Sequence, residues 1–282
     1  MAAGLILIGI GLGGINGMTV EAVDAAKSAD LRRYEAYTAL WKKSDLVELE
    51  SEVGKITKIM RPEIEDPGEL FALATKKVVA LLVVGDPLQA TTHVDLQLRA
   101  LEAGITCTTI HGISITSLVT GAIGLSNYRF GRQTTLAYPH QGWIATSPLE
   151  VIAFNQIQGL HTLVLLDLDP TGEGAGKQNP MQPKDAASVI RQMSNKLSEE
   201  LSEMLQSTTL EKLKFEGCRN IVQSIDELPA ILCTDMGTNE QRVKFLSVGS
   251  LLTAPEGRLH CLVIPAELGE VERKALKRWS KE

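Results

Sequence analysis

Residues 78–84, Val-Val-Ala-Leu-Leu-Val-Val, are apolar at every position. A strand with one face in water alternates apolar and polar residues, whereas a strand covered by helices on both faces has no need to alternate. This run therefore predicts a parallel strand inside an α/β protein. Apolar residues form 44% of the 282-residue chain and aromatic residues only 4%, so we expect a mostly aliphatic core.

Similar apolar runs alternate with helix-like segments along the first part of the chain. Strands are predicted at residues 5–10, 78–84 and 105–110, and helices at 20–29 and 92–103. This alternation favours a parallel sheet, in which ligands bind at the carboxyl ends of the strands.

The second half has a different order of elements. It predicts helices at 147–158 and 184–206, a strand at 162–168, and extended runs at 230–234, 243–248 and 259–264. We expect two α/β domains, residues 1–117 with a mostly parallel sheet and residues 118–282 with a mixed sheet. Between the strand and the long helix, residues 169–185 are rich in Gly and Pro and predict a mobile surface loop.

Charge and cysteine usage exclude several classes of function. The net charge is −6 and no long basic stripe is present, so we do not expect a nucleic-acid partner. No apolar run approaches the ~18 residues of a membrane span, and the first basic residue is Lys27, so we expect a soluble cytoplasmic protein without a membrane partner. The four cysteines lie far apart, which argues against a zinc site or a disulfide framework.

Gly9, Gly11 and Gly14 form a G-x-G-x-x-G motif after the first predicted strand. In a dinucleotide-binding fold the third glycine lies in the first turn of the next helix. Here Thr19 is the best helix N-cap, so four residues separate Gly14 from the helix, and Glu35 is poorly placed to bind a ribose. We therefore expect either a wide turn where a flat ligand approaches the backbone or a close-packed strand end.

Six motifs, taken together and in order, identify a family. They are GIGLGG, GDPLQATTH, HGISI, AYPHQGW, LHTLVLLDL and LHCLVIP. With them the chain resembles the diphthine synthases, which are tetrapyrrole-methylase-like (class III) methyltransferases that use S-adenosylmethionine. The resemblance extends over nearly the whole sequence.

The resemblance implies two α/β domains with S-adenosylmethionine in the cleft between them, and a homodimer. It also implies methylation of the amino group of a 3-amino-3-carboxypropyl side chain on a histidine of translation elongation factor 2, which forms diphthine. Two other interpretations stay open. One is a class III methyltransferase for a corrinoid or another tetrapyrrole, and the other is a non-catalytic nucleotide-binding module.

By motif position, the resemblance also implies the residues that contact the cofactor. These are Leu12, Asp86, Gln89, Ser114, Ile115, Leu166, Met236 and His260. Asp86 either accepts a hydrogen bond from the cofactor or only fixes its own turn, and Gln89 would contribute its main chain. His260 either takes a proton from the amine or stays neutral and bonds to the cofactor. No catalytic residue and no metal ligand is assigned.

Other histidines and aromatic residues carry weaker expectations. Capping and packing account for His93, His111 and His161, which lie at predicted strand or helix ends. The AYPHQGW motif contains Tyr138, His140 and Trp143, which either line the entrance for the substrate or belong to the core.

Overall fold

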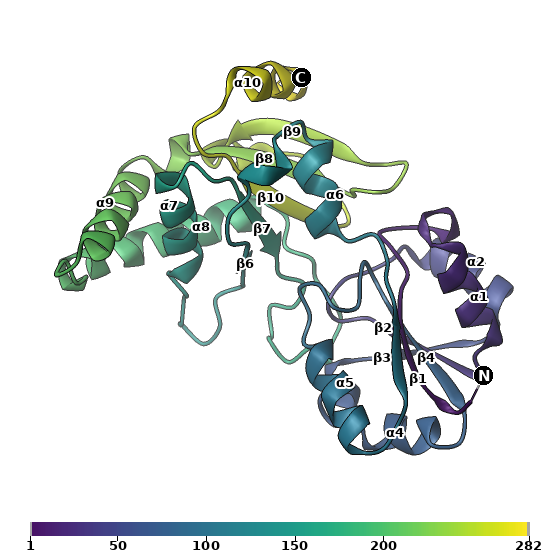
Figure 1. Ribbon diagram of the computed structural model, residues 1–282. Coiled ribbons are helices and arrows are strands. Elements are labelled where there is room, and N and C mark those ends of the chain that lie inside the picture. Colours follow the sequence, from purple (N-terminus) through teal and green to yellow (C-terminus); the bar gives the residue numbers. More distant parts are fainter. Residues whose placement is uncertain (1, 281–282) are drawn as a thin grey trace. The chain divides into compact units, whose positions relative to one another are not determined.

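The computed structural model describes residues 2–280, and its first sheet has five parallel strands (Figure 1). Their order across the sheet is β3-β2-β4-β1-β5. The strands are β1 (Gly4–Gly9), β2 (Leu31–Glu35), β3 (Ile56–Ile59), β4 (Val78–Val83) and β5 (Cys107–Ile110). The predicted parallel sheet and its strands at 5–10, 78–84 and 105–110 are confirmed.

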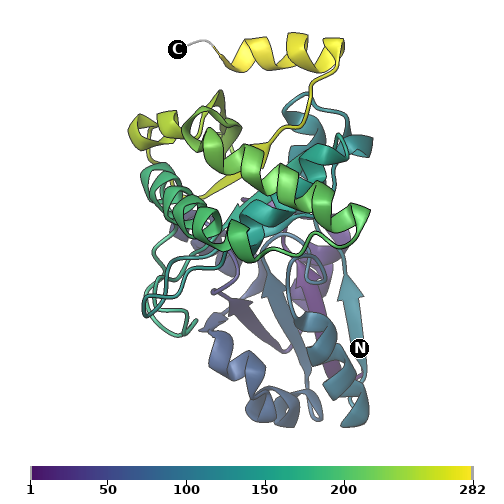
Figure 2. The same cartoon turned by 90° about the vertical axis from the view of Figure 1, so that its left-hand side faces the viewer.

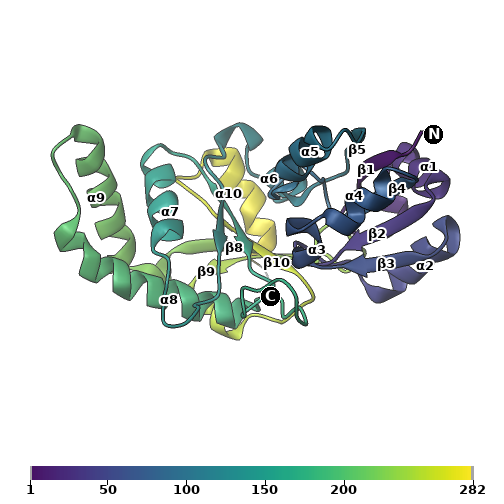
Figure 3. The ribbon, with the colours of Figure 1, turned by 90° about the horizontal axis from the view of Figure 1, so that it is seen from below.

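Helices cover both faces of this sheet. Ile6 and Ile8 pack with α1 (Val20–Ser28) and α2 (Lys43–Val53). Leu5 and Leu7 point the other way and share a second cluster with three further helices, α3 (Arg61–Glu65), α4 (Gly68–Ala74) and α5 (His93–Glu102). Figure 3 shows these three helices together on one side of β2 and β3. Burial on both faces explains why β1 and β4 are uniformly apolar.

The ends of β1, β4 and β5 meet through glycine backbone alone. A Cβ atom added to Gly9 would lie 2.5 Å from the Gly112 nitrogen and 2.7 Å from the Gly85 oxygen. One added to Gly112 would overlap the Gly85 oxygen and the Gly9 backbone. The three loops that follow these strands therefore start from one closely packed point. For the glycine motif after β1, this packing agrees with the expected alternative of a close-packed strand end.

The second sheet is mixed, as predicted. Its order is β6-β7-β10-β8-β9, in which β6 and β7 are parallel and all other neighbours are antiparallel. The strands are β6 (Thr134–Leu136), β7 (Thr162–Leu166), β8 (Pro229–Thr234), β9 (Arg242–Ser247) and β10 (His260–Ile264).

One large cluster joins this sheet to three helices. These are α7 (Ser147–Ile157), α8 (Pro183–Glu200) and α9 (Thr209–Gln223), and the last two are the green helices of Figure 2. The remaining helices are α6 (Ile115–Ala122) and α10 (Glu270–Leu276). No helix within residues 2–280 is long and apolar enough to cross a membrane.

The chain divides into two compact units, and each unit is built from three separate segments of the chain. The first contains residues 1–118, 173–178 and 237–239, and the second contains residues 119–172, 179–236 and 240–282. A single boundary after residue 117 does not describe the two short segments that return to the first unit. Within that unit Gly174 accepts a hydrogen bond from the Arg61 nitrogen, and Gln178 donates one to the Ala36 oxygen. Residues 173–178 of the predicted loop are thus held within the first unit.

We expect Gly112→Ala to destabilise the protein, because the new methyl group would force apart the ends of β1 and β4. The free energy of unfolding should fall by about 1–3 kcal/mol or more, as is typical of overpacking. Urea denaturation followed by circular dichroism measures this effect.

Gly121→Ala is the matched control, since Gly121 lies in α6 with nothing within 4 Å of an added Cβ. It should be neutral or stabilising by about 0.5–1 kcal/mol, because alanine favours a helix over glycine. Equal stability of the two variants would contradict the proposed packing of the strand ends.

Candidate functional site

The carboxyl edge of the first sheet presents main-chain groups from three neighbouring loops. Gly11 and Gly85 exchange two hydrogen bonds of 3.2 and 2.8 Å, and both have positive φ angles that favour glycine. The buried Trp41 ring donates to the Gly11 oxygen at 3.0 Å and supports this turn. Leu12 comes next in the chain, and a Cβ added to Gly237 would lie 2.7 Å from its Cβ.

The Asp86 carboxylate links the β4 loop to the β5 loop. Asp86 is 3% exposed, and its Oδ1 accepts from the Leu88 nitrogen at 2.9 Å. Its Oδ2 accepts from the Gly112 nitrogen at 3.3 Å and lies 2.7 Å from His111 Nδ1. Asp86 therefore does fix its own turn. Because a carboxylate has about four acceptor positions, one stays free for another donor.

Gln89, Ser114 and Ile115 lie at the same edge. Ser114 is 4% exposed, and its hydroxyl oxygen accepts from the Thr116 nitrogen at 3.3 Å and lies 3.0 Å from the Thr116 hydroxyl oxygen. The Thr116 hydroxyl also donates to the Gln89 side chain, while Ile115 begins α6. The structure thus brings five of the eight predicted cofactor contacts to one edge of the first sheet.

The other three lie at one edge of the second sheet. Leu166 ends β7, Met236 follows the end of β8, and His260 begins β10. Because β10 runs antiparallel to both neighbours, the start of β10 and the ends of β7 and β8 share one edge. Leu166 and Met236 are buried, and Met236 directly precedes the positive-φ Gly237.

Both ring nitrogens of His260 have partners. Nδ1 lies 3.0 Å from the Thr234 hydroxyl, and Nε2 lies 3.3 Å from the Gln182 side-chain oxygen. Burial lowers the pKa of His260 to about 4, which the Asp235 charge only partly offsets and Arg242 reinforces. A neutral ring then donates from Nε2 to Gln182 and accepts from Thr234. This geometry favours the neutral alternative and leaves no ring nitrogen available as a base.

Two of the other histidines are structural, as expected. The buried His93 ring bonds through Nδ1 to the Pro87 oxygen at 3.0 Å. The buried His161 accepts from the Ala266 nitrogen through Nδ1 and bonds to Glu272 through Nε2 at 3.1 Å. Burial lowers the pKa of His161, against the opposing effect of Glu272.

The prediction of packing or capping is wrong for His111. Its side chain is 70% exposed while one ring nitrogen pairs with the buried Asp86. The HGISI motif contained this residue, but nothing in the local sequence shows a pairing across 25 positions.

Glu35 ends β2, and its surroundings agree with the expectation that it is poorly placed to bind a ribose. It is fully buried and accepts hydrogen bonds from Tyr37 and Thr38, so its carboxylate faces the protein and not a ribose.

The AYPHQGW residues fall in the second unit. The core alternative is wrong for Trp143, which is 63% exposed, with Lys196 Nζ 5.9 Å from its ring centre. The Tyr138 hydroxyl donates to the Asn179 oxygen at 3.2 Å. Burial, together with Asp185 and Asp167, raises the pKa of Tyr138 to about 12, so this hydroxyl stays protonated near neutral pH.

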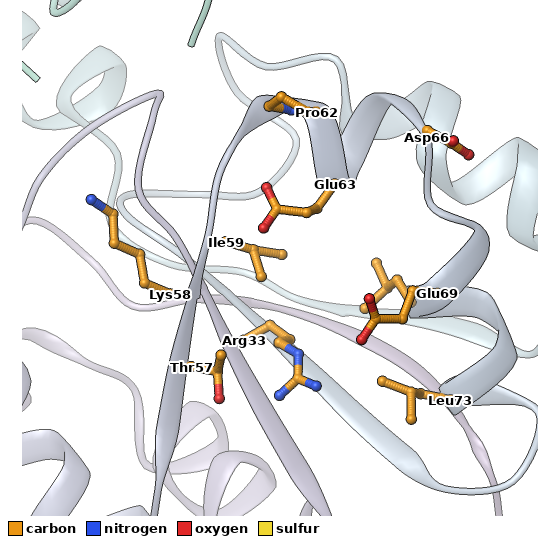
Figure 4. Close-up of a pocket in the computed structure, with 10 residues that line it drawn as sticks. Arg33, Thr57, Lys58, Ile59, Pro62, Glu63, Asp66, Glu69 and Leu73 are labelled. Carbon is orange, nitrogen blue, oxygen red and sulfur yellow. The ribbon is translucent and has the colours of Figure 1, made fainter. Parts of the chain in front are cut away.

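A cavity of about 390 Å³ lies elsewhere in the first unit, beside β2, β3 and α4 (Figure 4). Arg33, Glu63 and Glu69 are among the residues that line it. No predicted cofactor contact lines this cavity. Within residues 2–280, no group of three or more His, Cys, Asp or Glu side chains is arranged to hold a metal ion.

The lowered pKa of His260 predicts a loss of stability in acid. Between pH 6.5 and about 4 the unfolded chain binds a proton on this residue that the folded chain does not, so stability falls as the pH falls. His260→Gln keeps a hydrogen-bonding side chain but removes this proton uptake. The decrease in unfolding free energy from pH 7 to pH 4 should be smaller in the variant by up to about 3 kcal/mol. Denaturation series at the two pH values measure it, and identical slopes would contradict the assignment.

Comparisons with known proteins agree over the length of the chain. Residues 4–252 match the family of Tetrapyrrole (Corrin/Porphyrin) Methylases. The diphthine synthase of Methanospirillum hungatei is 32% identical over 98% of both chains, and that of Methanocaldococcus jannaschii is 31% identical over 97% of both. A solved diphthine synthase structure covers 98% of this chain and 95% of its own, with a TM-score of 0.78 and 28% identity. The chain therefore belongs to the diphthine synthase family of tetrapyrrole methylases and is a methyltransferase.

Proposed function

We propose that this protein transfers methyl groups from S-adenosylmethionine to translation elongation factor 2 in diphthamide biosynthesis. The acceptor is the amino group of the 3-amino-3-carboxypropyl side chain on a histidine of that factor. The observation that carries this proposal is the similarity to diphthine synthases over 98% of both chains. That coverage includes both sheets and every loop that forms the two edges described above.

The residues at the two edges fit a cationic cofactor. S-adenosylmethionine, when bound, supplies an electrophilic methyl group on a sulfonium. At the edge of the first sheet, Gly11 and Gly85 bond to each other through their main chains, and an added Cβ at Gly14 would meet nothing within 4 Å. Main-chain carbonyls and the Asp86 carboxylate suit positive charge, because oxygen acceptors bind charged donors strongly.

We propose that the eight predicted residues hold this cofactor. Leu12, Ile115, Leu166 and Met236 offer apolar surface, Ser114 offers a hydroxyl, and Gln89 offers its main chain. His260, held neutral by burial, adds no positive charge that would repel the sulfonium. These residues bind and orient the reactants and exclude water, which can account for several kcal/mol of a displacement barrier.

We also propose a homodimer in the cytoplasm, where the elongation factor works. The helix α5 supports the dimer, because Val94, Leu98 and Leu101 are each at least half exposed and lie on one face. A second copy would cover this apolar face, and sedimentation equilibrium measures the assembly.

The net charge of −6 argues against a nucleic-acid partner.

Labelled methyl transfer tests the acceptor. We expect the purified protein, given S-adenosylmethionine with a labelled methyl group, to label elongation factor 2 taken from cells that lack this enzyme. Factor from wild-type cells, whose acceptor is already modified, is the control and should take up little label. Label on an added corrinoid or porphyrin and none on the factor would instead favour a tetrapyrrole acceptor. Binding of the cofactor without any transfer would favour a nucleotide-binding module.

Asp86→Asn tests the cofactor site, because it removes the negative charge and preserves the size of the side chain. We expect S-adenosylmethionine to bind at least about tenfold more weakly by titration calorimetry, which corresponds to about 1.4 kcal/mol. Asp95→Asn is the control, since Asp95 is an exposed carboxylate on α5 that pairs with Arg99 at 3.7 Å. Unchanged affinity in a folded Asp86→Asn variant would remove Asp86 from the site.

A further inference from the structure

His111 and Asp86 form a pair in which one partner is exposed and the other is buried. The side chain of His111 is 70% exposed, whereas that of Asp86 is 3% exposed, and His111 Nδ1 lies 2.7 Å from Asp86 Oδ2. Among residues 2–280, Asp86 is the charged group within ion-pair distance of this ring. His111 follows the last residue of β5 directly, so it lies at the same edge as the glycine turn and Ser114.

The surroundings of Asp86 determine which ring nitrogen of His111 carries a proton. The Asp86 carboxylate already accepts hydrogen bonds from the main-chain nitrogens of Leu88 and Gly112, which an ionised carboxylate satisfies best. Its Oδ2 then needs a donor from the ring, so Nδ1 carries the proton. In a neutral ring the lone pair is therefore on Nε2, which the exposure of the side chain leaves accessible. An acidic side chain orients a histidine base in the same way in the Ser-His-Asp triad.

The proposed reaction requires a proton acceptor. The amine that attacks the methyl group is an alkyl amine, and the ordinary pKa of such groups lies between ~8 for a peptide amino terminus and ~10.4 for lysine. Near neutral pH it is mostly an ammonium ion, which has no lone pair to donate. His260 is not suited to the task, since both of its ring nitrogens have partners within the protein.

We propose that His111 is the general base that accepts the proton of the substrate amine, with Asp86 as the residue that orients it. This inference rests on the proposed function, because it needs an amine acceptor at the edge formed by Asp86 and Ser114. The ammonium gives one proton to His111 Nε2 and becomes a neutral amine. The nitrogen lone pair then forms the N–CH₃ bond as the S–CH₃ bond breaks, and the bonding electrons stay on sulfur as a neutral thioether. The protonated ring releases its proton to water through its exposed face.

His111→Gln tests this role, because glutamine can still donate to Asp86 but cannot act as a base. At saturating S-adenosylmethionine, we expect the rate of methyl transfer to elongation factor 2 near pH 7 to fall by roughly 10²–10⁴-fold. The deficit should shrink toward pH 9.5, because solvent then deprotonates the amine without help from the enzyme. Affinity for S-adenosylmethionine, measured by calorimetry, should stay within about twofold of wild type.

A second variant, His111→Ala, separates a base from a structural residue. Imidazole added to the buffer can reach this exposed position, and we expect it to restore part of the rate. A rate within about twofold of wild type near pH 7 in both variants would overturn the inference. So would a deficit that is the same at every pH and insensitive to imidazole, since that pattern indicates positioning only. If the wild-type protein does not label the factor at all, the proposed function fails, and this inference fails with it.

Discussion

The structure of the candidate site depends on direct backbone contact between three strand ends. Gly9 ends β1, whereas Gly85 and Gly112 lie just beyond the ends of β4 and β5. The three are so close that a single methyl group on Gly9 or Gly112 would collide with main-chain atoms. Because β1 lies between β4 and β5 in the sheet, this contact brings the three following loops to a common point. The hydrogen bonds that join Asp86 to His111 and to the Gly112 nitrogen require that proximity.

In the second sheet, the directions of the strands bring the predicted site residues to one edge, and glycine packing is not needed. Since β10 is antiparallel to β7 and β8, its first residue lies beside the last residues of its neighbours. The pairing of His260 with Thr234 is a cross-strand pair of this kind. The edge of the first sheet is therefore held by main-chain contacts, whereas that of the second sheet is formed largely by buried side chains.

The sequence predicts those parts of the fold that depend on neighbouring residues. The uniformly apolar strands were predictable because burial on both faces removes alternation, and the start of α1 was predictable because Thr19 caps it by accepting from the Ala22 nitrogen. The helices α2 and α9 were not predicted, since their exposed faces are strongly charged and only a few of their residues are buried. The exposure of His111 and the burial of Glu35 depend on contacts with other loops, which no local pattern contains.

The motif of residues 85–93 is anchored at both of its ends by contacts with other loops. His93 bonds to the Pro87 oxygen from a fully buried position, and its other ring nitrogen lies 3.7 Å from the buried Glu35 carboxylate at the end of β2. Asp86 is held from the opposite side by the Gly112 nitrogen of the β5 loop. One end of the loop is thus anchored toward β2 and the other toward β5, so little freedom is left for Asp86 to lose when a ligand binds. A loop held in this way can position the Asp86 carboxylate, and through it the His111 ring, with little entropic cost. Such positioning is what a methyl transfer without a metal or a covalent intermediate requires from the protein.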